Sequence, residues 1–390
     1  MKNILFLHQS PELYGSDKTI LMFICSLDKT KYKPIVVIPF EGPLTEELRK
    51  NDITVIIAPV LKLYRKMFTP AGLLKFAQEY QDGMKALEDL HKKYNFSLVY
   101  SHTLAVLIGI LFARKFNIKH LWHVQEILAK PKLINQTFKK LLSSDYNDIA
   151  IYDSKETMRF WIEGNEKLTA KSDFVWNGLD VSKYQEVSEA TIEGIRTKFF
   201  QVTKDETVIG LVGRINSWKG QQLLLEAFNK IAAKYPEVKL VFIGSAPPNQ
   251  EFFEEDLIAR VKEFKLQERV VIIPFQTNIN DFWASIDIAS VPSTEPEPFG
   301  MVAIEAMLHA KPVVAADHGG LTEIVLPGET GFLFINNNAD SLAEHLEKVI
   351  VDKVMQKRFG KAGKERVYST FTLEKHTEKI EKIFEDILEK

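Results

Sequence analysis

Apolar residues along the chain gather into short runs that alternate with longer amphipathic segments. In the first half, seven such runs predict strands at 3–9, 33–39, 53–59, 97–102, 120–125, 149–154 and 173–178. In the second half, six more follow at 207–214, 239–245, 269–275, 287–293, 312–317 and 331–335. Most are continuously apolar, which is typical of strands buried on both faces of a parallel sheet. Their alternation with helical patterns predicts βαβ units with right-handed crossovers.

The alternation restarts near residue 180, and 390 residues are too many for one ordinary core. We therefore predict an α/β protein with two Rossmann-like, doubly wound parallel-sheet domains facing across a cleft, at 1–180 and 181–365. The tail at 366–390 predicts a helix that packs back on the N-terminal domain. The residues on its apolar face are Ile380, Ile383, Phe384, Ile387 and Leu388.

The composition, with 45% hydrophobic and 26% charged residues and a mean hydropathy of −0.10, is that of a soluble globular protein. No apolar stretch reaches the length of a membrane span. The apolar run before His8 is too short for a secretory signal and is better interpreted as a strand. A single cysteine, Cys25, excludes an internal disulfide framework and a Cys-rich metal site. These features predict a cytoplasmic protein.

The net charge of −2 hides an asymmetry, since residues 1–180 carry 25 Lys and Arg against 20 Asp and Glu. This excess is too small and too dispersed to indicate a nucleic-acid partner. Two stretches of this half, 61–76 and 128–144, mix Lys and Arg with Leu, Ile and Phe. They could lie against an anionic membrane face as a peripheral contact, or they could be amphipathic helices that cover the sheet with solvated lysines.

Ligands of such sheets bind outside the carboxyl ends of the strands, so the residues that follow each strand are the first to consider. In LVGRINSWKG (211–220), Arg214 and Lys219 lie between a strand that ends at Gly213 and a helix that begins near Gln221. Two cations beside a helix start form an anion site suited to a diphosphate. The alternative is that both are solvated loop residues.

A second exit, EPEPFGMVAIEA (295–306), places Glu297 in a loop and Glu305 in the following helix, with Gly300 at the helix start. A carboxylate only accepts hydrogen bonds, so both acids suit a ligand rich in hydroxyl groups, such as a sugar or a ribose. The alternative is a solvated loop charge and a surface helix residue. At a third exit, Gly319 and Gly320 offer backbone N–H groups to phosphate or sugar oxygens, or form a plain turn.

These motifs occur in a recognisable order: R-x4-K after a strand, E-x7-E as EPEPFGMVAIE, then GGLTEIV and PGETGFLF. The chain resembles the retaining nucleotide-sugar glycosyltransferases of family 4, whose fold is the two-Rossmann GT-B architecture. The resemblance covers the second half by motif and the first half mainly by architecture. It implies that Arg214 and Lys219 bind the donor diphosphate, that Glu305 holds the nucleotide ribose, and that Glu297 holds hydroxyls of the donor sugar.

The same resemblance assigns further donor-site residues, whose loops would support sugar and phosphate or enclose the base. They are Gly213, Gly244, Ser245, Phe275, Thr277, Phe299, Gly300, Met301 and Val302. In the first half it implies that Gly15 lies beside the diphosphate and that His123 lies near the transferred sugar. Glu126 and His102 are weaker expectations for the acceptor side.

Glycosyl transfer develops negative charge on the departing diphosphate, so fixed positive potential there is the largest help that an enzyme can give. The residues expected to act in catalysis are Arg214, Lys219, Glu297 and His123. No D-x-D motif is present, and we expect no obligatory metal or cofactor beyond the nucleoside-diphosphate sugar donor. The acceptor is expected to be a glycan or lipid-linked glycan of bacterial cell-envelope polysaccharide synthesis. A nucleotide-sugar epimerase and a non-catalytic nucleotide-binding homologue remain alternatives.

Overall fold

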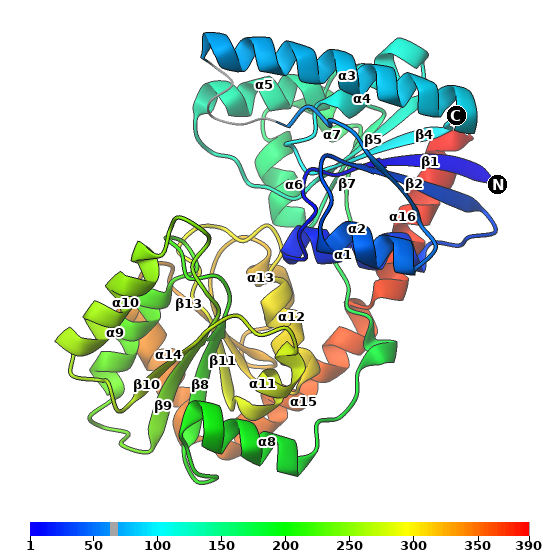
Figure 1. The fold of residues 1–390 in the computed structure, drawn as a ribbon. Helices are drawn as coiled ribbons and strands as arrows, with labels where there is room; N and C mark the ends of the chain where they lie inside the picture. The colour runs from blue at the N-terminus through cyan, green and yellow to red at the C-terminus, as the bar shows by residue number, and fades with distance from the viewer. Residues whose placement is uncertain (63–68, 390) are drawn as a thin grey trace. The chain divides into compact units, whose positions relative to one another are not determined.

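The computed structural model describes residues 1–62 and 69–389, and the chain divides into two compact units. Unit 1 consists of Met1–Gly178 and Leu373–Lys390, and unit 2 consists of Leu179–Thr372. Each unit has one parallel sheet with helices on both faces (Figure 1). Each of the thirteen runs predicted as strands overlaps one, which confirms the predicted fold class of two parallel-sheet α/β domains.

The sheet of unit 1 has seven parallel strands in the order β3-β2-β1-β4-β5-β6-β7. The strands are β1 (Lys2–Leu7), β2 (Tyr32–Ile38), β3 (Thr54–Ile57), β4 (Leu98–His102), β5 (Lys119–Val124), β6 (Ile149–Tyr152) and β7 (Ser172–Phe174). The last one is shorter than the run at 173–178 predicted. Most residues of the central strands are buried, as their continuous apolar pattern requires.

The helices of unit 1 cover both faces of this sheet. They are α1 (Gly15–Ser26), α2 (Pro43–Lys50), α3 (Pro70–Tyr94), α4 (Ile108–Phe116), α5 (Lys132–Leu142), α6 (Lys155–Ile162), α7 (Glu166–Thr169) and α16 (Leu373–Leu388). One face packs on α1, α2 and α16, and the other on helices that include α3, α4 and α5. Residues 63–68 of the basic stretch 61–76 lie outside the described part of the chain.

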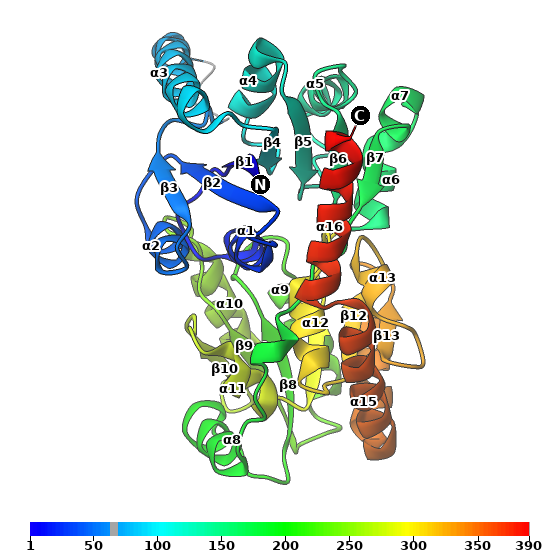
Figure 2. The same cartoon turned by 90° about the vertical axis from the view of Figure 1, so that its right-hand side faces the viewer.

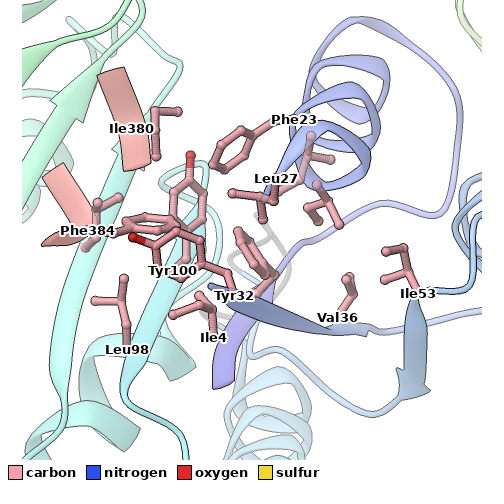
Figure 3. Close-up of a cluster of buried hydrophobic side chains, with 14 of the residues drawn as sticks. Ile4, Phe23, Leu27, Tyr32, Val36, Ile53, Leu98, Tyr100, Ile380 and Phe384 are labelled. Atoms are coloured by element: carbon pink, nitrogen blue, oxygen red, sulfur yellow. The ribbon is translucent and has the colours of Figure 1, made fainter. Parts of the chain in front are cut away.

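The last helix, α16, belongs to unit 1 although it is far from the rest of that unit in sequence (Figure 2). Its Ile380 and Phe384 lie in the same buried cluster as Phe23 and Tyr100 (Figure 3). The Phe384 ring meets the Tyr32 ring edge-on at 5.5 Å. The apolar face predicted for the C-terminal helix therefore forms part of the unit 1 core.

The sheet of unit 2 has six parallel strands in the order β10-β9-β8-β11-β12-β13. The strands are β8 (Thr207–Val212), β9 (Val238–Ile243), β10 (Val270–Ile273), β11 (Ile288–Val291), β12 (Val313–Ala316) and β13 (Gly331–Phe334). The helices are α8 (Glu189–Ile195), α9 (Gln221–Ile231), α10 (Phe252–Glu263), α11 (Ile279–Ser285), α12 (Met301–Leu308), α13 (Leu321–Ile324), α14 (Ala339–Val351) and α15 (Lys353–Thr370). A π-helical segment, Arg196–Phe200, continues α8.

The unit boundary near the C-terminus falls after α15, whereas the sequence pattern placed it at residue 365. That position lies inside α15, which is continuous and packs within unit 2. A Cβ atom at Gly360 of this helix would lie 1.9 Å from the carbonyl oxygen of Ala310, so the two segments are in direct contact. Arg366 donates a hydrogen bond of 2.8 Å to the carbonyl oxygen of Glu323. These contacts hold residues 366–370 in unit 2.

Both sheets reverse their strand order at one point. In unit 1 the reversal lies between β1 and β4, and in unit 2 it lies between β8 and β11. Loops that leave such a pair of strands run to opposite faces of the sheet, which opens a crevice at the carboxyl edge and makes it the usual ligand position in doubly wound folds. The residues that follow β8 and β11 are therefore the first candidates for a site.

Candidate donor site at the carboxyl edge of unit 2

The loop between β8 and α9 carries both predicted phosphate-binding cations. Arg214 is exposed, and its carbonyl oxygen accepts a hydrogen bond of 2.8 Å from Nε2 of Gln221 at the start of α9. The Asn216 side chain holds the other end of the loop by accepting from the backbone N–H of Lys219 at 3.0 Å. The loop is thus held by hydrogen bonds at both ends.

Lys219 pairs with Glu297, which follows β11, across the reversal point. Its Nζ lies 2.6 Å from Oε1 of Glu297, and the side chains are 18% and 6% exposed. The hydroxyl of Ser293 donates to the same carboxylate oxygen at 2.6 Å. Lys219 also lies over the Trp218 ring, 4.2 Å from its centroid. A cation predicted to bind phosphate and an acid predicted to bind sugar hydroxyls therefore lie within one buried cluster.

The paired glycines after β12 pack directly on the loop that carries Glu297. Gly320 donates its N–H to the carbonyl oxygen of Glu297 at 2.8 Å. A Cβ atom at Gly319, which has φ +60°, would lie 2.4 Å from that same carbonyl oxygen. At Gly320 a Cβ would lie 2.5 Å from Cα of Phe299. Both positions require glycine because a side chain would push the Glu297 loop away.

Glu305 lies on α12, which begins at Met301 after Gly300 with φ +118°. Its Oε2 accepts a hydrogen bond of 3.2 Å from the indole N–H of Trp283 on α11. Trp283 is completely buried, whereas Glu305 is partly exposed. The predicted ribose-binding carboxylate is therefore held by a buried aromatic side chain from the neighbouring helix.

The two loops predicted to enclose the base are in contact with each other. The backbone N–H of Phe275 donates to the hydroxyl of Ser245 at 3.0 Å. A Cβ at Gly244, which has φ +148°, would lie 2.0 Å from the carbonyl oxygen of Gly213. The exits of β8, β9 and β10 thus form one connected edge, and Thr277 lies two residues beyond Phe275 in the same loop.

Unit 1 carries a buried network of histidines and acids at its own reversal point. His8, directly after β1, has Nε2 2.7 Å from Oδ1 of Asp17 on α1. Its Nδ1 lies 3.0 Å from Nδ1 of His102 at the end of β4. Burial, together with the neighbouring histidines, lowers the pKa of His102 well below its ordinary value. Asp17 also accepts from the N–H of Tyr14, so it ties His8 to the start of α1, where Gly15 lies.

His123 belongs to a second carboxylate–histidine pair in the same unit. Its Nε2 lies 2.7 Å from Oδ1 of Asp153, and its Nδ1 lies 2.6 Å from the Tyr100 hydroxyl. The side chain is 1% exposed. With both ring nitrogens engaged, His123 can contact a sugar only if one of these two partners moves. In this structure the histidine is held inside unit 1.

Glu126 lies in the segment after β5, and its carboxylate accepts from the backbone N–H groups of Leu104 and Gln125 at 3.1 Å each. Burial raises its pKa to about 7, although these two hydrogen bonds oppose the shift. The carboxyl group therefore titrates near neutral pH. A group with this property can hold or release a proton at physiological pH.

We expect Glu126→Gln to change the pH dependence of unfolding. Because the folded-state pKa is raised from about 4.5 to about 7, the wild type loses stability as pH rises through this interval. Glutamine stays neutral, so the difference in melting temperature between variant and wild type should be about 2–4 °C more positive at pH 8 than at pH 5. Differential scanning calorimetry at both pH values measures this difference. The exposed Glu163→Gln is the matched control, and a pH-independent difference for Glu126→Gln would contradict the assignment.

The sequence pattern did not single out Ser293, Trp283 or Asp153, each of which holds a predicted site residue, or Asp17, which pairs with His8 beside His102. Ser293 ends the run at 287–293, so its position at a strand exit was a usable signal. Trp283 lies in an amphipathic helix, where a buried aromatic side chain is normally interpreted as core.

Among residues 1–62 and 69–389, no group of three His, Cys, Asp or Glu side chains is arranged to hold a metal ion. In the same ranges no helix is long and apolar enough to cross a membrane.

Residues 195–366 match the family glycosyl transferases group 1, and this segment contains Arg214, Lys219, Glu297 and Glu305. The chain carries a group 1 glycosyltransferase domain. The site residues of unit 2 lie inside this glycosyltransferase domain, whereas the histidine network of unit 1 lies outside the matched segment. The predicted family resemblance is thereby confirmed at the level of the group 1 glycosyltransferases.

Two curated relatives are similar to the chain in sequence, and one solved structure is similar to it in fold. The chain is 30% identical to the capsular polysaccharide biosynthesis glycosyltransferase CapM of Staphylococcus aureus over 54% of its own length and 53% of the length of CapM. It is 25% identical to N-acetyl-alpha-D-glucosaminyl L-malate synthase of Bacillus anthracis over 67% of this chain and 71% of that protein. HepE of Anabaena, solved in complex with UDP and glucose, has the same fold, with a TM-score of 0.84 over 99% of this chain and 100% of HepE at 23% identity.

Proposed function

We propose that the protein is a retaining glycosyltransferase that moves a hexose-type sugar from a nucleoside-diphosphate sugar to a glycan or lipid-linked acceptor. The observation that carries this proposal is the buried cluster of Lys219, Glu297 and Ser293 at the strand-order reversal of unit 2. A cation, an acid and a hydroxyl at this position suit a ligand that is both anionic and rich in hydroxyl groups. The group 1 glycosyltransferase domain supports the same substrate class.

In this proposal Arg214 and Lys219 stabilise the charge that develops on the departing diphosphate. Fixed cations aimed at that charge lower the barrier without reorganising during the reaction. Glu297 orients the donor sugar through its hydroxyls while Lys219 and Ser293 hold its carboxylate. We further propose that transfer occurs on the front face, where the leaving phosphate helps to deprotonate the acceptor hydroxyl. Anomeric NMR of the product tests this step, and an inverted linkage would overturn it.

We propose unit 1 as the acceptor side, with His102 and Glu126 as its polar residues, and we propose that His123 lies near the transferred sugar. Its exposed leucines fit a peripheral contact with a membrane that carries a lipid-linked acceptor. Leu73 and Leu74 at the start of α3 are 55% and 76% exposed, and Leu133 at the start of α5 is 75% exposed. Lys132 adjoins the last of these. Exposed leucines beside lysines favour an anionic interface over a purely solvated helix face. Flotation with vesicles that contain phosphatidylglycerol, compared with vesicles of phosphatidylcholine alone, measures this contact, and equal recovery in both would contradict it.

A thermal-shift panel of UDP-, GDP- and ADP-sugars tests the proposed function. A ligand that binds only the folded state stabilises it by about 2.7 kcal/mol at one hundred times its dissociation constant. We expect one base to raise the melting temperature clearly and the other two to raise it little. HepE was solved with UDP, so UDP-glucose is the first compound to try. No shift with any of the three nucleotides would refute donor binding at this site.

A further inference from the structure

Trp283 makes a polar contact that its burial alone does not explain. The side chain is 0% exposed. Its indole N–H nevertheless has a polar partner, because it donates a hydrogen bond of 3.2 Å to Oε2 of Glu305. A buried indole must find an acceptor, and a hydrogen bond to a charged carboxylate is stronger than one to a neutral group. The two side chains come from α11 and α12, so the contact links the helix that precedes β11 in the chain with the helix that follows it.

The helix that presents Trp283 is anchored at its carboxyl end by two cations. Nη1 of Arg196 donates to the carbonyl oxygen of Ser285 at 3.0 Å, and Nζ of Lys311 donates to that of Ala284 at 2.7 Å. Arg196 is also paired with Asp287 at 3.0 Å. These bonds satisfy carbonyl groups that a helix end would otherwise leave without partners. The end of α11 is therefore fixed in unit 2.

Aromatic packing fixes the side of the same helix. The Phe282 ring, next to Trp283, contacts the rings of Phe199 and Phe200 from the π-helical segment, at 5.3 Å and 6.1 Å between centroids. Phe282 itself is buried. A helix held along its side and at its end keeps the indole of Trp283 in one orientation. Its N–H is thus a fixed donor rather than a mobile one.

We propose that Trp283 is a positioning residue that holds the carboxylate of Glu305 in the orientation that reads the ribose hydroxyls of the nucleotide. This inference rests on the proposed function, in which Glu305 binds the ribose. A glutamate has three side-chain torsions, and fixing them before the ligand arrives removes an entropic cost of binding. The indole thereby makes the site specific for ribonucleotides over deoxyribonucleotides, without touching the nucleotide itself.

The test compares dissociation constants for ribonucleotides and deoxyribonucleotides by isothermal titration calorimetry. The probes are UDP, GDP and ADP, each with its 2′-deoxy and 3′-deoxy counterpart. We expect the wild type to prefer the ribonucleotide of its base by about tenfold or more over at least one deoxy form. Trp283→Phe keeps most of the buried ring volume but removes the N–H, and it should lower this preference at least threefold. Its affinity for the deoxy form should stay within twofold of the wild-type value.

Two further variants separate the possible failures. Trp161→Phe is the matched control, because Trp161 is also fully buried and its N–H donates to a carbonyl oxygen, that of Glu126 in unit 1. It should leave the preference unchanged, so a loss that Trp283→Phe shares with Trp161→Phe would overturn the inference. Glu305→Ala removes the acceptor oxygens and should abolish the preference. If it does and Trp283→Phe keeps the preference, the positioning role is wrong but ribose binding by Glu305 stands. If Glu305→Ala keeps the preference, the ribose role in the proposed function is itself wrong.

Discussion

Replacing Lys219 with alanine should lower kcat/KM for sugar transfer by about 10²–10³-fold, the usual effect of removing one group that stabilises developing negative charge. Lys219 is the less exposed of the two cations after β8, and its ammonium group lies at the strand-order reversal of unit 2. The loss should fall mainly on kcat, because charge on the diphosphate grows most in the transition state. Steady-state kinetics with the donor found in the thermal-shift panel measure it.

The ion pair requires a control for stability in this experiment. Lys219→Ala leaves the buried Glu297 carboxylate without its cation, and removing one partner of a buried pair is strongly destabilising. The double variant Lys219→Ala with Glu297→Gln removes both charges and should recover most of the melting temperature while activity stays low. Lys230→Ala, at an exposed ion pair on α9, controls for loss of a lysine. Near-wild-type turnover in the Lys219→Ala enzyme would remove this residue from the mechanism.

Gly220→Ala should destabilise unit 2 by about 3 kcal/mol or more and weaken donor binding together with it. Gly220 has φ +81°, and a Cβ there would lie 1.9 Å from the carbonyl oxygen of Pro292. The strand exit that carries Ser293 and Glu297 must move to make room. Because this exit is part of the site, the same change should disturb the ion pair with Lys219. Thermal unfolding and nucleotide titration of the variant measure both effects.

Gly328→Ala is a matched control for this substitution. Gly328 has φ +80°, almost the same as Gly220, and nothing lies within 4 Å of its added Cβ. This substitution should lower the free energy of unfolding by only about 1–2 kcal/mol, the cost of backbone strain, and should leave nucleotide affinity unchanged. Equal destabilisation of the two variants would mean that the contact with Pro292 carries none of the effect.

The fold could be predicted from the sequence because its signal is local. A strand buried on both faces of a parallel sheet must be apolar at nearly every position, so each strand is visible as a short run whatever its neighbours are. The last helix is visible for a similar reason, since its apolar face repeats at helical spacing. Element ends were less accurate, as at β7 and at the start of the C-terminal helix, because they depend on packing between distant segments.

The unit 2 site residues were visible because Lys219, Glu297 and Glu305 belong to short motifs at strand exits. The groups that hold them were not, because they are paired through space. Trp283 reaches Glu305 from a different helix, and Lys219 and Glu297 lie 78 positions apart. In unit 1, Asp153 lies directly after β6 and pairs with His123, which is 30 positions earlier in the chain. Such pairs have no signature in a single sequence, because the residues next to an acid or a histidine in the chain do not indicate whether its side chain is buried.

A crystal structure of the protein soaked with the nucleotide sugar that gives the largest thermal shift tests donor binding at this site most directly. We expect the diphosphate within hydrogen-bond distance of Lys219 and Arg214, with the ribose at Glu305 and the sugar at Glu297. A nucleotide bound elsewhere, or bound with these four side chains turned away from it, would show that unit 2 does not bind the donor as proposed.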